Sequence, residues 1–75
     1  MITYFDGTEA KIGDRVDYDG EPSIVEAVVE TVEQREKWGV NERGLMFRSE
    51  TIGLVFEPCS SVTWSSIVLM GRGAA

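Results

Sequence analysis

Residues 11–18 read Lys-Ile-Gly-Asp-Arg-Val-Asp-Tyr, and the run Asp-Gly-Glu-Pro follows at residues 19–22. Ile12, Val16 and Tyr18 stand at even spacings, with charged residues between them, which is the pattern of a strand with one buried face. An aspartate followed by glycine indicates a tight turn. The stretch therefore predicts a short strand that closes in an acidic turn.

Further strands are predicted on both sides of this stretch. Before it, Ile2–Phe5 is a candidate first strand that a glycine turn follows. After it, Gly44–Ser49 and Leu54–Glu57 are predicted to form a hairpin. Pro58 ends the second arm of that hairpin, because proline cannot donate to a strand ladder.

The last part of the chain is expected to contain one more strand. Val62–Ser65 is predicted to form a single short helical turn that includes Trp64, and Ser66–Met70 to form the closing strand. Residues 73–75 are expected to be a frayed C-terminal tail.

The segment Ser23–Val32 has two interpretations. As a helix, it would begin with a capping box formed by Ser23 and Glu26. As a strand, it is a run of β-branched residues, which fit a pleated sheet better than a helix. It contains no Leu or Met, and the long, bent strand is therefore favoured, with the helix left open. The polar residues 34–43 that follow are predicted to be a loop.

Five or six short strands with frequent turns predict a mainly all-β fold. The expected architecture is a small five-stranded SH3-like barrel, which removes exposed strand edges by closing on itself. One domain over residues 1–72 accounts for the whole pattern.

The 75 residues carry 13 acids and 7 bases, a net charge of −6. Residues 1–36 hold ten acids against three bases, a net −7, and residues 37–75 hold three acids against four bases, a net +1. This bias makes nucleic acid an unlikely partner, because nucleic-acid binding rests on basic patches. It favours a partner with a basic protein surface, although acids also serve solubility alone.

No targeting signal is recognised in the sequence. The apolar runs are too short to cross a bilayer, and the start lacks a basic segment followed by an apolar one. A single cysteine, Cys59, cannot form an internal disulfide. A cytoplasmic protein without membrane contact is therefore expected.

The residue types needed for most catalytic and metal sites are missing. Histidine is absent and Cys59 has no base near it in sequence, so nucleophile pairs and zinc sites are not expected. Asp14, Asp17 and Asp19 lack the further ligands of a calcium loop. We therefore expect no enzyme activity, no metal and no cofactor.

The remaining candidates are binding residues. Trp38 stands among charged residues, where a large ring serves either as an interface anchor or as a lid over one end of the fold. Tyr18 and Tyr4 suggest an SH3-type aromatic groove of the kind that receives proline-rich peptides, beside an acidic loop formed by Asp17, Asp19 and Glu21.

Four pieces of the chain, taken together, resemble one group of proteins. They are residues 4–9 (Tyr-Phe-Asp-Gly-Thr-Glu), residues 12–16 (Ile-Gly-Asp-Arg-Val), Trp38-Gly39, and residues 44–47 with residues 53–58. Their order and spacing are similar to short, uncharacterised bacterial proteins with an SH3-like fold, some of which resemble immunity proteins of toxin systems. The chain departs from that pattern at residues 21–31, where Pro22 and glutamates stand in place of Gly-Val-Val-like residues.

This resemblance speaks to the fold more than to activity. The charge asymmetry between the two halves and the missing catalytic residue types predict a non-enzymatic protein-binding module, of which an immunity-like inhibitor of a basic partner is one form. Two alternatives remain open at this point. One is a structural or regulatory barrel that acts as a homo-oligomer through strand edges or Trp38. The other, less favoured, is a nucleic-acid-binding SH3-like domain.

Overall fold

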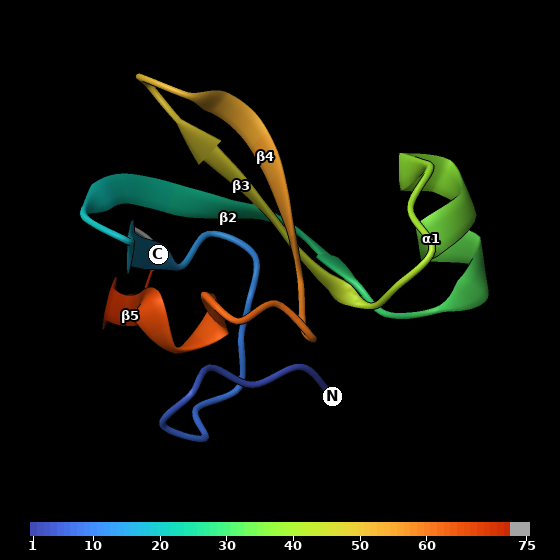
Figure 1. The fold of residues 1–75 in the computed structure, drawn as a ribbon, viewed down its shortest axis with the longest axis horizontal. Coiled ribbons are helices and arrows are strands. Elements are labelled where there is room, and N and C mark those ends of the chain that lie inside the picture. Colours follow the sequence, from blue (N-terminus) through green and yellow to red (C-terminus); the bar gives the residue numbers. More distant parts are fainter. Residues whose placement is uncertain (73–75) are drawn as a thin grey trace.

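The computed structural model describes residues 1–72. It contains five antiparallel strands in one sheet, in the spatial order β4-β3-β2-β1-β5 (Figure 1). The strands are β1 Arg15–Tyr18, β2 Glu21–Val29, β3 Gly44–Ser49, β4 Gly53–Pro58 and β5 Ile67–Gly71. The mainly β prediction is therefore confirmed. Within the described residues β4 and β5 are the two edges and do not pair with each other, so the predicted closure into a barrel is not confirmed.

The predicted turn after β1 is confirmed as a two-residue hairpin loop at Asp19 and Gly20, whereas Glu21 and Pro22, predicted to belong to the turn, are the first residues of β2. Asp19 and Gly20 both have positive φ, 50° and 91°, the combination that matches the natural twist of two paired strands. Tyr18 pairs with Glu21 directly beneath the loop. The Gly20 N–H donates to Asp17 Oδ1 over 2.6 Å, which stabilises the loop from within.

The predicted start of this strand was wrong. β1 begins at Arg15, and Ile12 is 70% exposed. The reason is a turn: the Asp14 N–H donates to the Lys11 carbonyl over 3.1 Å, and Gly13 has a φ of 92°. The even spacing of Ile12, Val16 and Tyr18 therefore continues in the sequence across a turn of the backbone, and it does not mark the start of the strand.

For the ambiguous segment Ser23–Val32, the strand interpretation is confirmed as far as Val29, where β2 ends. Its last residues were predicted wrongly, because Thr31 caps a helix that begins at Val32. A bulge between Val25 and Ala27 shifts the register against β3, as the extra residue of a bulge does. Val25 consequently packs in the main hydrophobic cluster, whereas Ala27 and Val29 belong to a second cluster. The bend that was predicted has this bulge as its cause.

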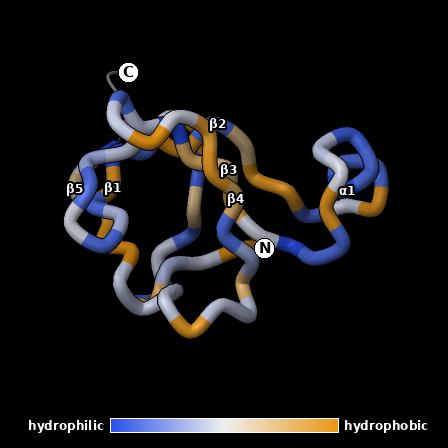
Figure 2. Tube along the Cα trace, turned by 45° about the horizontal axis from the view of Figure 1, so that its top comes forward, coloured by the Kyte–Doolittle hydropathy of each residue, from blue (hydrophilic) through white to orange (hydrophobic). Residues whose placement is uncertain are grey.

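The predicted loop over residues 34–43 was wrong in its first half, which is helical. The helix α1 spans Val32–Trp38. Thr31 caps it in a full capping box with Gln34, and Gly39 ends it in the left-handed conformation at φ 70°. Both signals are local sequence patterns, and α1 is mostly hydrophilic along its length (Figure 2).

The first ten residues form no strand, which corrects the prediction for Ile2–Phe5. Only an isolated bridge joins Thr3 to Glu9. Ile2, Tyr4 and Ala10 are nevertheless buried in the main cluster. This segment therefore packs against the sheet through side chains rather than through a ladder.

The C-terminal part agrees with its prediction. β3 and β4 form the expected hairpin, with Ser49 opposite Gly53. A short 3-10 turn, η1 Trp64–Ser66, stands where a single helical turn was expected, and β5 follows it directly. The predicted tail, residues 73–75, lies outside the described residues.

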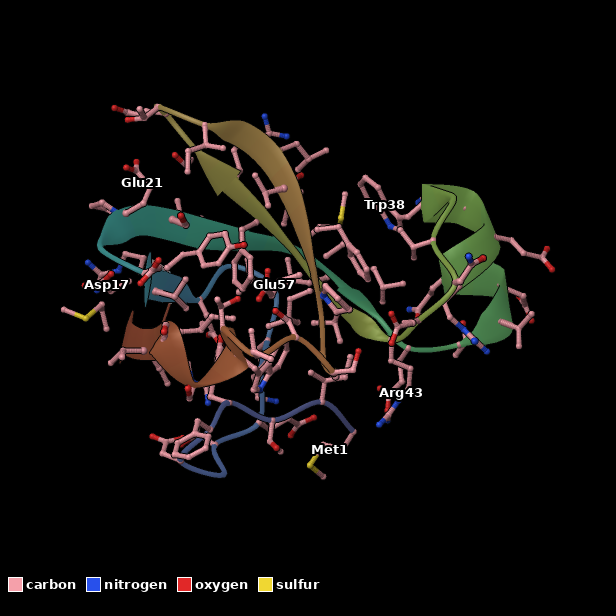
Figure 3. The ribbon with its side chains drawn as sticks, in the orientation of Figure 1. Met1, Asp17, Glu21, Trp38, Arg43 and Glu57 are labelled. Atoms are coloured by element: carbon pink, nitrogen blue, oxygen red, sulfur yellow. The ribbon has the colours of Figure 1, made fainter. Side chains whose placement is uncertain are left out.

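The main hydrophobic cluster lies on one face of the curved sheet. Its buried members are Ile2, Tyr4, Ala10, Val16, Val25, Leu45, Phe47 and Ile67. The second cluster lies beside α1, where Trp38, Val40 and Phe56 pack against Ala27, Val29 and Met46. Trp38 thus packs on the part of the sheet beside α1, whereas the β1–β2 turn lies at the opposite end of the sheet (Figures 1 and 3).

Candidate functional site

Tyr18 is the last residue of β1 and points into the fold. Its ring stacks on Phe47 with 5.0 Å between the centroids, and its hydroxyl donates to Glu57 Oε1 over 2.6 Å. Burial and the neighbouring Glu57 carboxylate raise the pKa of Tyr18 to about 12, because both disfavour a negative phenolate. Tyr18 therefore stays a neutral hydrogen-bond donor.

Glu57 is 5% exposed and has several donors around it. Besides Tyr18, the Thr63 hydroxyl donates to Glu57 Oε2. Burial alone would raise the pKa of Glu57, but hydrogen bonds from Ser61, Thr63 and Tyr18 outweigh it and hold that pKa below its ordinary value. The carboxylate is satisfied and ionised, so its place is structural.

The three predicted acids lie around the β1–β2 turn (Figure 3 labels Asp17 and Glu21). Asp17 accepts the Gly20 N–H and Glu21 accepts the Ser49 hydroxyl over 2.9 Å. Asp19, at the tip of the turn, is exposed, and its carboxylate has no ion-pair partner within residues 1–72. Of the three, Asp19 has the carboxylate best placed to meet a cation from outside.

A groove of about 530 Å³ opens beside this turn. We name it the turn groove; it is lined by Tyr18, Asp19, Gly20, Glu21, Ile52, Val55 and Thr63. Two lining residues are acids, none is a base, and Ile52 is 55% exposed. The turn groove therefore combines an apolar wall with negative charge.

The structure brings together three of the predicted site residues, whereas Tyr4, the second tyrosine predicted for the groove, is buried in the main cluster. Tyr18, Asp19 and Glu21 line the turn groove, and Asp17 stands next to it without being part of its wall. Trp38 lies apart, half-buried against the second cluster, at the other side of the sheet (Figure 3). This packing is consistent with the lid, one of the two roles that the sequence left open.

Sequence reasoning missed half of the groove wall. Ile52 and Val55 come from the β3–β4 hairpin and Thr63 from the segment before η1. Nothing in their local sequence marks them as lining residues, because their place depends on how the sheet curls. Exposure of an isoleucine at a turn is the one signal that could have drawn attention to Ile52.

A second hollow, of about 630 Å³, lies on the outer face of the sheet. Arg15 and Arg48 flank Ile24 there, since Ile24 pairs with both residues in neighbouring strands. Arg48 Nε is 2.8 Å from Glu26 Oε1. One of the two cations is thus already paired within the chain.

The aspartates considered as a cation site do not form one. Asp14 is 1% exposed, accepts the Tyr4 hydroxyl over 2.6 Å, and binds Arg72 Nη1 through both oxygens. Burial opposes its ionisation, yet hydrogen bonds from Tyr4, the Lys11 amide and Arg72 keep the pKa of Asp14 below its ordinary value. No three acidic or cysteine side chains within residues 1–72 are grouped so that they could hold a metal ion.

Two further features bear on chemistry and location. Burial raises the pKa of the half-buried Cys59 thiol, which lowers the share of reactive thiolate. Among the described residues, no helix has the length and apolar character that a membrane crossing requires.

Two arginines that could serve the nucleic-acid-binding alternative, Arg43 and Arg48, are each paired with a glutamate of this chain. Arg43 lies 3.8 Å from Glu30 and Arg48 lies 2.8 Å from Glu26.

Compared with known proteins, the chain matches no family model, no curated protein and no solved structure at a significant level.

Proposed function

We propose that this chain is a non-enzymatic protein-binding module that receives a basic partner in the turn groove. The observation that carries the proposal is the composition of the groove wall: Asp19 and Glu21 supply negative charge, Ile52 supplies exposed apolar surface, and no lining residue is basic. A lysine or arginine side chain fits such a wall, because its stem packs on apolar groups while its head meets the acids.

The fold that accompanies this proposal is the SH3-like barrel. Three features support it. β5 pairs with β1, a 3-10 turn precedes β5, and the Tyr18–Glu57 hydrogen bond joins two strands that are not neighbours in the sheet. A sheet that curls far enough to make this bond has most of the curvature of a small barrel.

The resemblance to immunity proteins extends the proposal to the kind of partner. A toxin whose active surface is basic would be blocked by a small acidic protein that covers it. The net −7 of residues 1–36 would speed the encounter through long-range attraction. A cytoplasmic inhibitor of this kind needs no cofactor.

Affinity capture tests the proposal with a matched pair of variants. Asp19→Asn removes the charge at the tip of the turn while keeping a residue that tolerates positive φ, and Glu33→Gln removes one exposed charge from α1. Both variants change the net charge equally. We expect Asp19→Asn and Ile52→Ser to lose a protein that the parent chain retains from extract, and Glu33→Gln to retain it.

Salt dependence and a defined probe complete the test. Retention should weaken from low to moderate salt, because exposed charge pairs are screened over a Debye length of about 8–10 Å. A peptide rich in lysine and arginine should compete. Equal loss in Asp19→Asn and Glu33→Gln would contradict the groove, and no retained protein at either salt would contradict the function.

A further inference from the structure

Strand β4 is an edge of the sheet, and its outer side pairs with no other strand within residues 1–72. On its inner side it pairs with β3 in unbroken register, from Gly44 opposite Pro58 to Ser49 opposite Gly53. Residues 53–56, Gly-Leu-Val-Phe, contain neither a charge nor a proline, which are common means of blocking an edge strand. This stretch of β4 is therefore able to accept a further strand.

The ladder with β3 determines which backbone groups of β4 face the open edge. The Cys59 N–H donates to the Arg43 carbonyl over 2.9 Å, and this pair continues the register of the ladder. Because hydrogen-bonded pairs alternate along antiparallel strands, Leu54 and Phe56 direct their N–H and carbonyl groups outward. Pro58 lies two residues farther on the same side, which agrees with this assignment, because an edge proline lacks its donor on the open side.

The two sides of β4 differ in their chemistry. Val55 lies on the side of the turn groove and lines it together with the acids Asp19 and Glu21. Leu54 lies on the other side of the strand, where it is 46% exposed and stands opposite Arg48 of β3. A strand added to β4 would therefore meet acids on one side, and an apolar residue and an arginine on the other.

We propose that the turn groove takes an extended segment of the partner, with basic and apolar residues in alternation, which adds to β4 as a further strand. This inference rests on the proposed function and specifies how the partner binds. Strand addition is a known mode of peptide recognition, in which backbone hydrogen bonds supply affinity and alternate side chains supply specificity.

The geometry of a ladder assigns each residue of the segment to one side. Residues whose N–H and carbonyl groups bond to Leu54 and Phe56 have their side chains on the Leu54 side, because paired residues share a face of the sheet. The residues between them direct their side chains toward the groove, on the Val55 side. Every second residue of the segment therefore meets the acids.

Charge complementarity determines which residue types stand on which side. A lysine or arginine in the groove meets Asp19 and Glu21, and none of the residues that line this groove is a base. On the other side the same residue would lie beside Arg48, so an apolar residue is favoured there. A second copy of this chain, with a net charge of −6, lacks this complementarity.

Two N-methylated peptides of equal composition and charge test the register. The parent peptide is a decapeptide in which lysine and valine alternate; one derivative carries N-methyl groups on its valines and the other on its lysines. The valines present their N–H groups to β4, so their methylation should raise the dissociation constant at least about tenfold, because several hydrogen bonds are lost. Methylation of the lysines, whose N–H groups point away from β4, should have a much smaller effect.

Amide hydrogen exchange on the full chain identifies the strand. Saturation with the parent peptide should protect the amides of Leu54 and Phe56, which exchange freely in the chain alone. The Val55 amide bonds to β3 and should be protected with and without the peptide. The amide of Val62, a residue that is 95% exposed, should stay unprotected in both conditions.

The outcomes separate this inference from the proposed function. If Asp19→Asn abolishes binding of the parent peptide, but both methylated peptides bind alike or Leu54 stays unprotected, strand addition is overturned and the groove remains the binding site. Failure of the parent peptide to bind would overturn both. Protection of Leu54 that follows the concentration of the chain alone would make a second copy the occupant, and would also overturn the proposal.

Discussion

The Tyr18 hydroxyl and the Glu57 carboxylate are 2.6 Å apart, although two strands separate β1 from β4 in the sheet. The bond requires the sheet to curl until β4 approaches β1. The same carboxylate accepts the Thr63 hydroxyl, which ties in the segment before η1. Tyr18 and Thr63 also line the turn groove, so Glu57 holds two of its wall residues in place from below.

Glu57→Gln is expected to destabilise the fold. The introduced side-chain amide would present a donor to one of two hydroxyl donors, Tyr18 or Thr63, and a buried group would lose its partner. Such a loss costs about 1–3 kcal/mol. Urea unfolding measures it, with Glu50→Gln as the control because Glu50 is exposed in the β3–β4 turn. Equal unfolding midpoints for the two variants would contradict the structural role of Glu57.

Acid should destabilise the protein through Asp14 and Glu57. Their folded pKa values lie below the ordinary ones, so the stability that they contribute is fully present above the unfolded pKa, about 4. It is lost as the pH falls through the lower folded pKa. We expect the urea midpoint to fall between about pH 5 and pH 2, and to fall less in Asp14→Asn. A parallel decline in both proteins would contradict this account.

The two tyrosines should titrate late. Burial and the Asp14 carboxylate raise the pKa of Tyr4, and burial and Glu57 raise that of Tyr18 to about 12. Because the folded pKa of each tyrosine is raised, the stability that its neutral hydroxyl contributes is fully present below the unfolded pKa, about 10. That contribution is lost as the pH rises through the folded pKa. Ultraviolet absorbance should show little tyrosinate near pH 10 in the native protein and about half ionisation in urea. Equal curves would contradict the burial of both hydroxyls.

Local patterns were enough to predict the hairpins. The Asp19-Gly20 turn and the β3–β4 hairpin depend on a few neighbouring residues, and the structure has both. The same reasoning missed α1, although Thr31 and Gln34 form the capping box that had been considered at Ser23 and Glu26. Ser23 with Glu26 and Thr31 with Gln34 both have the residue types and spacing of a capping box. The β-branched residues after Ser23 favour a strand, whereas the mostly polar residues after Thr31 do not.

The sequence predicted only those groove residues that are close to one another along the chain. Tyr18, Asp19 and Glu21 lie within four consecutive residues of one hairpin, and they share the turn groove. Ile52, Val55 and Thr63 reach the same groove only because the sheet curls through the Tyr18–Glu57 bond. That bond joins residues 39 positions apart, and no periodicity in the sequence reports it.

Trp38→Ala separates the two roles that the sequence left open for this side chain. The ring packs against Ala27, Val29 and Met46, so truncation should destabilise the protein by about 3 kcal/mol, at the low end of the range for tryptophan because the ring is only half-buried. Lys37→Ala is the control, since it truncates the exposed Lys37 side chain, whose ammonium nitrogen lies 6.0 Å from the ring centroid, an exposed contact worth about 0.5–1 kcal/mol.

Two measurements on Trp38→Ala decide between the lid and the interface anchor. Urea unfolding should show the loss of stability, and capture of a lysine- and arginine-rich peptide should be unchanged, because Trp38 lies outside the turn groove. The opposite combination, full stability with lost capture, would make Trp38 the contact residue and would move the binding surface from the β1–β2 turn to α1. If Trp38 is a lid at α1, the turn groove, with its two acids and the exposed Ile52, remains the surface proposed to bind a partner.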